Sequence, residues 1–140
     1  LERAWHRVHR SRTAIGPLIM DQAVLAGVGN VYRSEVLFRH RLDPAKPGSA
    51  LREDRWRAVW DDLVRLMPIG VATGRILTVE EDVVAAEAAL AAGEPVPVPD
   101  PLVPYVYKRT GEACFVCGSR VRTAVVAGRN LFWCGRCQRR

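Results

Sequence analysis

The spacing of the cysteines constrains this 140-residue chain more than any other feature. Two C-x2-C pairs are separated by sixteen residues, and the four members are Cys114, Cys117, Cys134 and Cys137. Each two-residue spacer lets a tight turn aim two sulfurs at one point, and four thiolates suit tetrahedral zinc. Two disulfides or an exposed redox pair are the alternatives, but the N-terminus has no apolar signal region for secretion. We therefore expect one structural zinc bound by all four cysteines.

The residues between the two pairs indicate a β-hairpin. RVRTAVV and NLFW have the composition of short strands, and they would join near Ala127-Gly128-Arg129-Asn130. A segment this small has little core of its own, so metal binding would supply its folding free energy. Arg129 would lie at the apex, either gripping a phosphate or groove or as a solvated loop charge. Five more arginines are expected near it: Arg120, Arg122, Arg136, Arg139 and Arg140.

Apolar periodicity and turn residues predict a helical region before this hairpin. The expected helices are 2–10, a second from about Pro17 to Gly27, 30–40 with Asn30 as N-cap, 50–67 and 80–92. Pro68 should end or kink the fourth of these. Five prolines within 95–104 predict an extended spacer. The fold class is thus mainly α with a small β component, divided into 1–94, the linker 95–104, and the zinc hairpin 105–140.

Positive charge is segregated along the chain. Residues 76–107 hold six acids and no Lys or Arg, so the rest of a chain of net charge +6 carries +12. The last 33 residues hold eight basic residues against Glu112 alone, and 19 of the 21 basic residues are Arg. Such faces can simply keep a protein in solution. Segregation this strong favours a polyanion, and nucleic acid is the first candidate.

The turn between the second and third expected helices is rich in glycine. A helix ending at Gly27 and another starting at Asn30 would leave free N–H groups in one concave turn, which favours an anion. Glycine at position 29 would let a phosphate approach the backbone closely. A plain helical hairpin is the simpler alternative. A helix-hairpin-helix motif is another, but it requires a small residue where Arg33 stands.

Three segments carry a resemblance to a known family. Residues 15–44, IGPLIMDQAVLAGVGNVYRSEVLFRHRLDP, closely resemble the helix–two-turns–helix segment of the formamidopyrimidine-DNA glycosylase and endonuclease VIII family. Residues 107–118, YKRTGEACFVCG, and 127–138, AGRNLFWCGRCQ, resemble that family's zinc finger. Residues 79–104 have no counterpart that we can place.

The resemblance implies a DNA-binding role in the repair of oxidised bases. The family flips the damaged nucleotide out of duplex DNA, excises the base and cleaves the abasic strand. By resemblance, Gly29 and Asn30 would bind phosphate beside the lesion, Arg129 would grip the backbone, and the four cysteines would bind zinc. The expected partner is double-stranded DNA with oxidised or abasic sites. We expect a monomer in the cytoplasm of a prokaryote, associated with the nucleoid and not with a membrane.

The family's chemistry needs an N-terminal proline followed by glutamate at the head of a β-sandwich domain. This sequence begins Leu1-Glu2, and its only lysines are Lys46 and Lys108. We therefore expect no catalytic residue in this chain, which would be the C-terminal half of a glycosylase and AP lyase whose catalytic domain is a further partner. Gly16 stands where the formamidopyrimidine branch has lysine, so the chain is more similar to endonuclease VIII.

Three rival functions remain open from the sequence. A stand-alone zinc-containing nucleic-acid-binding module without glycosylase activity is the main one. A ribosome-associated RNA binder is second, because a small-subunit ribosomal protein has similar helical elements, although the zinc hairpin argues against it. A redox protein that uses the C-x2-C pairs is third.

Overall fold

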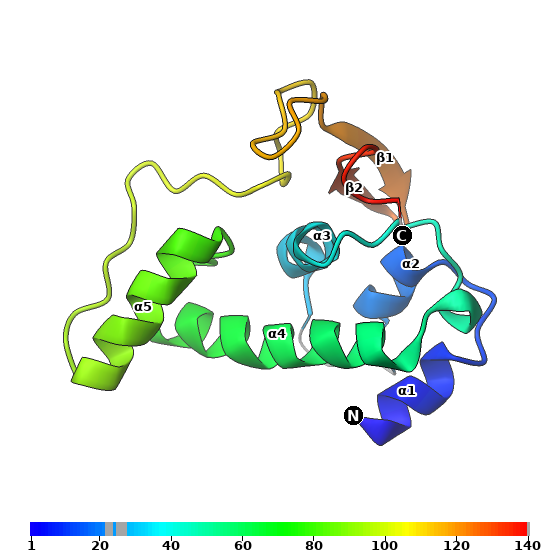
Figure 1. Cartoon of the computed structure of the whole chain (residues 1–140), viewed down its shortest axis with the longest axis horizontal. Helices are drawn as coiled ribbons and strands as arrows, with labels where there is room; N and C mark the ends of the chain where they lie inside the picture. Colours follow the sequence, from blue (N-terminus) through cyan, green and yellow to red (C-terminus); the bar gives the residue numbers. More distant parts are fainter. Residues whose placement is uncertain (22–23, 25–27, 140) are drawn as a thin grey trace.

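A computed structural model describes residues 1–21, 24 and 28–139 of the chain, and Figure 1 shows their arrangement. The elements, in chain order, are α1 (Glu2–Val8), α2 (Ile15–Met20), α3 (Asn30–Arg39), the short 3-10 helix η1 (Gly48–Ala50), α4 (Glu53–Thr73), α5 (Glu80–Ala92), β1 (Arg122–Val126) and β2 (Arg129–Trp133). The predicted class, mainly α with a small β component, is confirmed. None of the helices in the described ranges is both long and apolar enough to cross a membrane.

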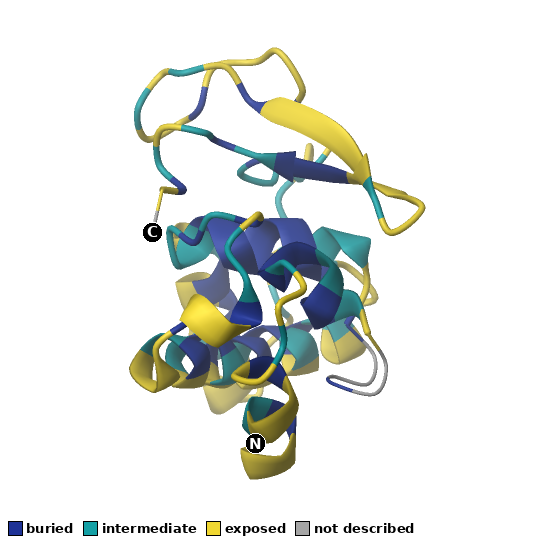
Figure 2. Ribbon diagram, turned by 90° about the vertical axis from the view of Figure 1, so that its right-hand side faces the viewer, coloured by how far each residue is buried: buried dark blue, intermediate teal, exposed yellow. Residues whose placement is uncertain are grey.

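Helix α3 lies at the centre, between α4 on one side and the hairpin on the other (Figure 1). Its apolar side chains are buried, with Val36 and Leu37 fully inaccessible and Tyr32 8% exposed. Figure 2 shows that β2 turns a buried face towards the helices while β1 forms the exposed edge. The hairpin is therefore seated on the helix that begins at the glycine-rich turn.

Helix α4 is longer than predicted because Pro68 does not end it. The helix runs from Glu53 to Thr73 and stops at Gly74, whose φ of 71° is left-handed. Proline within a helix costs about 3 kcal/mol. Leu66 and Ile69 on either side of Pro68 are almost fully buried, so they continue the apolar face across it. Packing of that face outweighs the lost hydrogen bond.

Helix α2 is shorter than predicted. It ends at Met20, because Asp21 has extended backbone angles, whereas the sequence favoured a helix up to Gly27. Gly27 itself lies outside the described residues. Pro17 falls in the first turn of α2, as expected.

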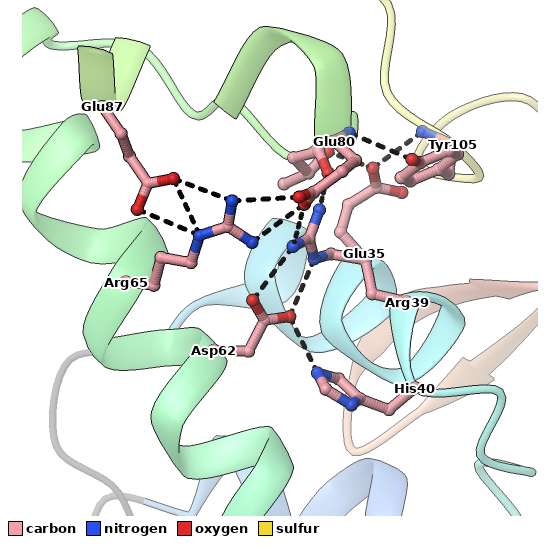
Figure 3. Close-up of polar contacts among 9 residues, drawn as sticks. Glu35, Arg39, His40, Asp62, Arg65, Glu80, Glu87 and Tyr105 are labelled. Carbon is pink, nitrogen blue, oxygen red and sulfur yellow. Dashed lines mark hydrogen bonds and ion pairs between the residues drawn. The ribbon is translucent and has the colours of Figure 1, made fainter. Parts of the chain in front are cut away.

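The acidic segment that follows α4 pairs with arginines of the helical core. Glu80 accepts hydrogen bonds from Arg39 (2.8 Å) and Arg65 (2.9 Å), and Glu87 accepts a second set from Arg65 (Figure 3). The predicted helix 80–92 is confirmed as α5. Two of its acids therefore neutralise core arginines.

Asp62 on α4 joins the same network. Its carboxylate accepts hydrogen bonds from Arg39 (2.7 and 3.0 Å) and lies 2.8 Å from Nε2 of His40 (Figure 3). Burial by itself would raise the pKa of Asp62, but the hydrogen bonds from His40 and Arg39 outweigh it and lower the pKa to about 2. This cluster fixes the end of α3 to α4.

The proline-rich segment 95–104 contains neither helix nor strand, in line with the sequence. Val96, Val98 and Leu102 nevertheless pack against the helical core, so the segment is held to the surface rather than standing free. The domain boundaries given above stay a prediction.

Candidate nucleic-acid interface and zinc site

The four cysteines converge at the end of the hairpin remote from its turn. Their Sγ atoms all lie within 4.8 Å of one another, with Cys114–Cys137 at 3.8 Å and Cys117–Cys134 at 3.4 Å. A disulfide requires about 2.05 Å. Four sulfurs around one zinc at about 2.3 Å stand roughly 3.8 Å apart, so this donor set fits that ion. Hydrogen bonds from the backbone and hydroxyl of Ser119 lower the pKa of Cys117 to about 6, whereas burial raises the pKa of Cys134 and of Cys137.

A buried carboxylate fixes the start of the zinc-binding segment to α3. Glu35 is inaccessible to solvent and accepts backbone hydrogen bonds from Tyr105 (2.7 Å), Val106 (2.8 Å) and Tyr107 (3.2 Å), together with one from the hydroxyl of Thr78. Burial raises the pKa of Glu35, and these four hydrogen bonds oppose that rise. The zinc segment and the helical core are thereby held as one unit.

Three further hydrogen bonds fix the C-terminal part of the zinc-binding segment, from Phe132 to Gln138. The Ser34 hydroxyl accepts a hydrogen bond from the backbone N–H of Phe132 (3.3 Å). The buried Gln138 accepts from the N–H of Cys134 (2.8 Å) and donates to the carbonyl of Leu42 (3.0 Å). Each of these polar groups has a partner inside the protein, so the hairpin has one defined position on α3.

The glycine-rich turn begins α3 as expected, but Asn30 is not its N-cap. Gly29 occupies that position with extended backbone angles, and Asn30 is the first helical residue. The Asn30 amide donates to the carbonyl of Asn130 (2.7 Å), so it joins the turn to the hairpin rather than closing the helix. A Cβ on Gly29 would meet no described atom within 4 Å. Neither packing nor backbone angles among the described residues therefore require glycine there, which leaves the helix start open to a ligand from outside.

Arg33 is a functional candidate that the sequence did not single out. It is fully buried, and its guanidinium donates to the carbonyl of Val126 (3.4 Å) and to the side chain of Asn30. Its Nε has no partner in the part of the chain that the structure describes. Burial, and secondarily the charge of Arg129, lower the pKa of Arg33. The sequence signal that could have identified Arg33 was its position, because it is a cation on the apolar face of the predicted helix 30–40.

The turn of the hairpin presents Arg129. Ala127 and Gly128 both have positive φ (53° and 75°), as a two-residue hairpin turn requires, and β2 begins at Arg129 immediately after them. Arg129 is exposed. The predicted location of Arg129 at the apex is confirmed.

Asn30, Arg129 and Lys108 line one hollow of about 300 Å³, together with Tyr107 and Phe132. No carboxylate lines it in the described chain. Lys108 comes from the segment before the first cysteine, and its ammonium lies 5.5 Å from the centre of the Tyr107 ring. The sequence predicted no binding role for Lys108. Cationic and amide donors from three separate elements thus meet in one concavity, which suits an anion.

The remaining hairpin arginines are not near the apex, contrary to expectation. Strand register pairs Val126 with Arg129 next to the turn and Arg122 with Trp133 at the opposite end. Arg120, Arg122, Arg136 and Arg139 line a separate hollow at that end, and Arg140 lies outside the described residues. Arg120 and Arg122 lie at the start of the hairpin and Arg136 and Arg139 lie after its second strand, so all four lie at the zinc end.

Comparison with known proteins matches both parts of the chain. The family model of the formamidopyrimidine-DNA glycosylase H2TH domain matches residues 1–81, and a model described as the zinc finger found in FPG and IleRS matches residues 111–140. The second match supports a single structural zinc at the four-cysteine cluster.

Curated relatives and solved structures indicate the same family as the two family models. Endonuclease 8 1 of Mycobacterium tuberculosis is 50% identical over 96% of this chain, and formamidopyrimidine-DNA glycosylase of Pseudomonas aeruginosa is 37% identical over 90%. The chain covers 48% and 43% of those proteins, so it spans about half the length of the curated relatives it matches. The complex of Lactococcus lactis Fpg with abasic-site DNA superposes with a TM-score of 0.74 at 26% identity, covering 99% of this chain and 47% of that one. The predicted resemblance and its leaning towards endonuclease VIII are confirmed, and the chain belongs to the formamidopyrimidine-DNA glycosylase H2TH family.

Proposed function

We propose that this chain is the DNA-binding half of a bifunctional DNA glycosylase and AP lyase that repairs oxidised bases. The observation that carries the proposal is the basic hollow in which Asn30, Arg129 and Lys108 meet. Its donors come from the start of a helix, from the tip of a zinc-anchored hairpin and from the segment before the first cysteine, and all three are suited to backbone phosphates. The open space beside Gly29 supports close approach of a phosphate to the helix start.

The proposed ligand is duplex DNA with an oxidised or abasic site, bound by one protein monomer in the nucleoid of a prokaryotic cell. Gly29, Asn30 and Arg129 are the proposed contact residues, with Lys108 as an addition from the structure. The complex of Lactococcus lactis Fpg with abasic-site DNA supports this ligand. The relatives named above are glycosylases or endonucleases, which supports the enzyme class of a protein containing this half.

Fluorescence anisotropy with a duplex carrying an abasic-site analogue tests the proposal. If about five phosphates are contacted, log K against log salt should slope at roughly −4 to −5. Arg129→Ala should weaken binding and flatten the slope by about one unit. Arg75→Ala is the matched control, because Arg75 is exposed beyond the end of α4, which Figure 1 shows on the other side of α3 from the hairpin. A slope near zero, or equal losses in both variants, would contradict the proposed interface.

We further propose that the 140-residue chain by itself binds DNA without forming a Schiff base. The family's chemistry uses a proline amine followed by glutamate, and the pair Pro-Glu occurs nowhere in this sequence. Borohydride trapping with abasic DNA checks this, because it captures any Schiff base covalently. The expected result is binding without a trapped adduct. An adduct at Leu1, Lys46 or Lys108 that forms faster than with a free amine would contradict it.

A further inference from the structure

The arginine cluster at the zinc end of the hairpin has no role in the interface proposed above. Its four members, Arg120, Arg122, Arg136 and Arg139, surround a hollow of about 410 Å³. The zinc-binding segment has a single acid, Glu112, and that carboxylate pairs with Arg109 (3.3 Å). None of the four arginines forms an ion pair with any described residue. Four neighbouring cations are therefore left without a counter-ion among the described residues.

Two of these arginines have their guanidinium groups positioned by contacts with the protein backbone. Arg120 donates to the carbonyl of Gly111 (2.5 Å). The guanidinium of Arg122 lies on the backbone of Gly135, where a Cβ would come within 2.7 Å of Cζ and 2.8 Å of Nη1. Glycine between the second pair of cysteines thus makes room for the arginine. A guanidinium held in this way loses less side-chain entropy when it binds a phosphate.

The register sets the distance between this cluster and the tip. Four residue steps separate the Arg122–Trp133 pair from the Val126–Arg129 pair, which is about 13 Å at 3.3 Å per residue. DNA phosphates follow one another at about 3.4 Å along the axis per strand, so for a duplex that lies along the hairpin 13 Å corresponds to roughly four base pairs. A duplex gripped by Arg129 can therefore present another stretch of its backbone to the cluster.

We infer that Arg120, Arg122, Arg136 and Arg139 form a second phosphate-binding site, which holds the DNA backbone about four base pairs away from the phosphate at Arg129. The inference rests on the proposed function, because it takes duplex DNA as the ligand. Bidentate pairing with phosphate oxygens is the chemistry that arginine supplies and that lysine does not reproduce. The site extends the footprint along the duplex without reading bases.

Duplex geometry and charge provide the main test. Three 21-base-pair duplexes, each with one abasic-site analogue, are compared. The analogue lies at the centre of the first, three base pairs from one end of the second, and three base pairs from the other end of the third. The wild-type chain should bind one of the end-placed duplexes more weakly than the centred one, because the backbone on that side is too short to reach the cluster. Arg122→Gln/Arg136→Gln should lower the salt slope on the centred duplex by about two units and abolish its advantage over that end-placed duplex.

Arg3→Gln/Arg75→Gln is the charge-matched control. Arg3 is exposed on α1, and Figure 1 shows α1 and α4 on the other side of α3 from the hairpin. The inference is overturned if this control and the cluster variant change the slope equally, or if the end-placed duplexes bind like the centred one. Arg129→Ala separates the two proposals. If Arg129→Ala weakens binding while the cluster variant binds as tightly as the control variant, the second site is refuted and the proposed function stands. If the wild-type chain binds none of the duplexes, the proposed function is refuted.

Gly135→Ala tests the same site with every charge retained. The new methyl group should displace the Arg122 guanidinium, and Gly135 does not have a positive φ, so the backbone accepts alanine. Binding to the centred duplex should weaken several-fold while the zinc content stays at one per chain. Unchanged affinity would contradict a role for the seated guanidinium. If Arg122→Gln/Arg136→Gln loses its zinc, Gly135→Ala still tests the second site.

Discussion

Glu35 provides the sharpest test of how the zinc segment is fixed to the helices. Four donors surround its carboxylate: Oε1 accepts from Thr78 and from the N–H of Tyr105, and Oε2 accepts from the N–H groups of Val106 and Tyr107. In Glu35→Gln the amide nitrogen can face Thr78, whose hydroxyl can turn and accept. Only the N–H of Tyr105 then loses its partner, which costs about 1–3 kcal/mol.

Glu35→Ala should be more damaging than Glu35→Gln. It leaves all four donors without the carboxylate and opens a cavity, so we expect a loss above about 4 kcal/mol. Thermal unfolding followed by circular dichroism measures both variants. One kcal/mol corresponds to roughly 3–4 °C in a chain of this size, so glutamine should lower Tm by about 3–12 °C and alanine by more. Glu81→Ala on the exposed side of α5 is the control and should change Tm by less than about 2 °C.

One result would refute this reasoning. If Glu35→Ala unfolds at the same temperature as Glu81→Ala, the four hydrogen bonds contribute nothing to the attachment of the zinc segment. DNA binding provides a second measurement on the same variants. Glu35 holds the backbone of Tyr107, which lines the basic hollow, so any loss of affinity in Glu35→Gln would come from movement of this segment on α3.

Two further predictions concern the metal and the acid sensitivity of the fold. Cys117→Ser should reduce bound zinc from one per chain to near zero and unfold residues 105–140. Val125→Ala, on the exposed strand of the same hairpin, is the control and should retain the metal. Metal analysis and amide exchange measure both variants, and two disulfides in the purified protein would contradict the site. The pKa of Asp62 falls from 3.8 to about 2 on folding, so its carboxylate contributes roughly 2 kcal/mol above pH 4, and this contribution is lost as the pH falls towards 2. Denaturant unfolding should therefore show Asp62→Asn destabilised at pH 7 and close to the wild type near pH 2, and an equal difference at both pH values would refute the assignment.

The sequence by itself determined those features that depend on residues close together in the chain. The C-x2-C spacing identified the zinc cluster because the geometry of two short loops around one ion depends on few residues. Periodicity located α3 and α5, since their apolar or alanine-rich faces follow the helical repeat. The positive φ values at Ala127 and Gly128 belong to a two-residue turn, and the strands on either side made the position of Arg129 predictable.

Tertiary structure decided the rest, because the deciding contacts join residues far apart in the chain. Helix α4 continues through Pro68 because the residues on both sides of it are buried against other elements, and no local propensity contains that information. Asn30 bonds to the hairpin a hundred residues later, which is why it does not cap its own helix. The same long-range docking brings Lys108 and Arg129 to the start of α3, and the strand register carries the other hairpin arginines to the zinc end. Sequence supplied the cations, and burial of the hairpin on α3 decided which of them meet.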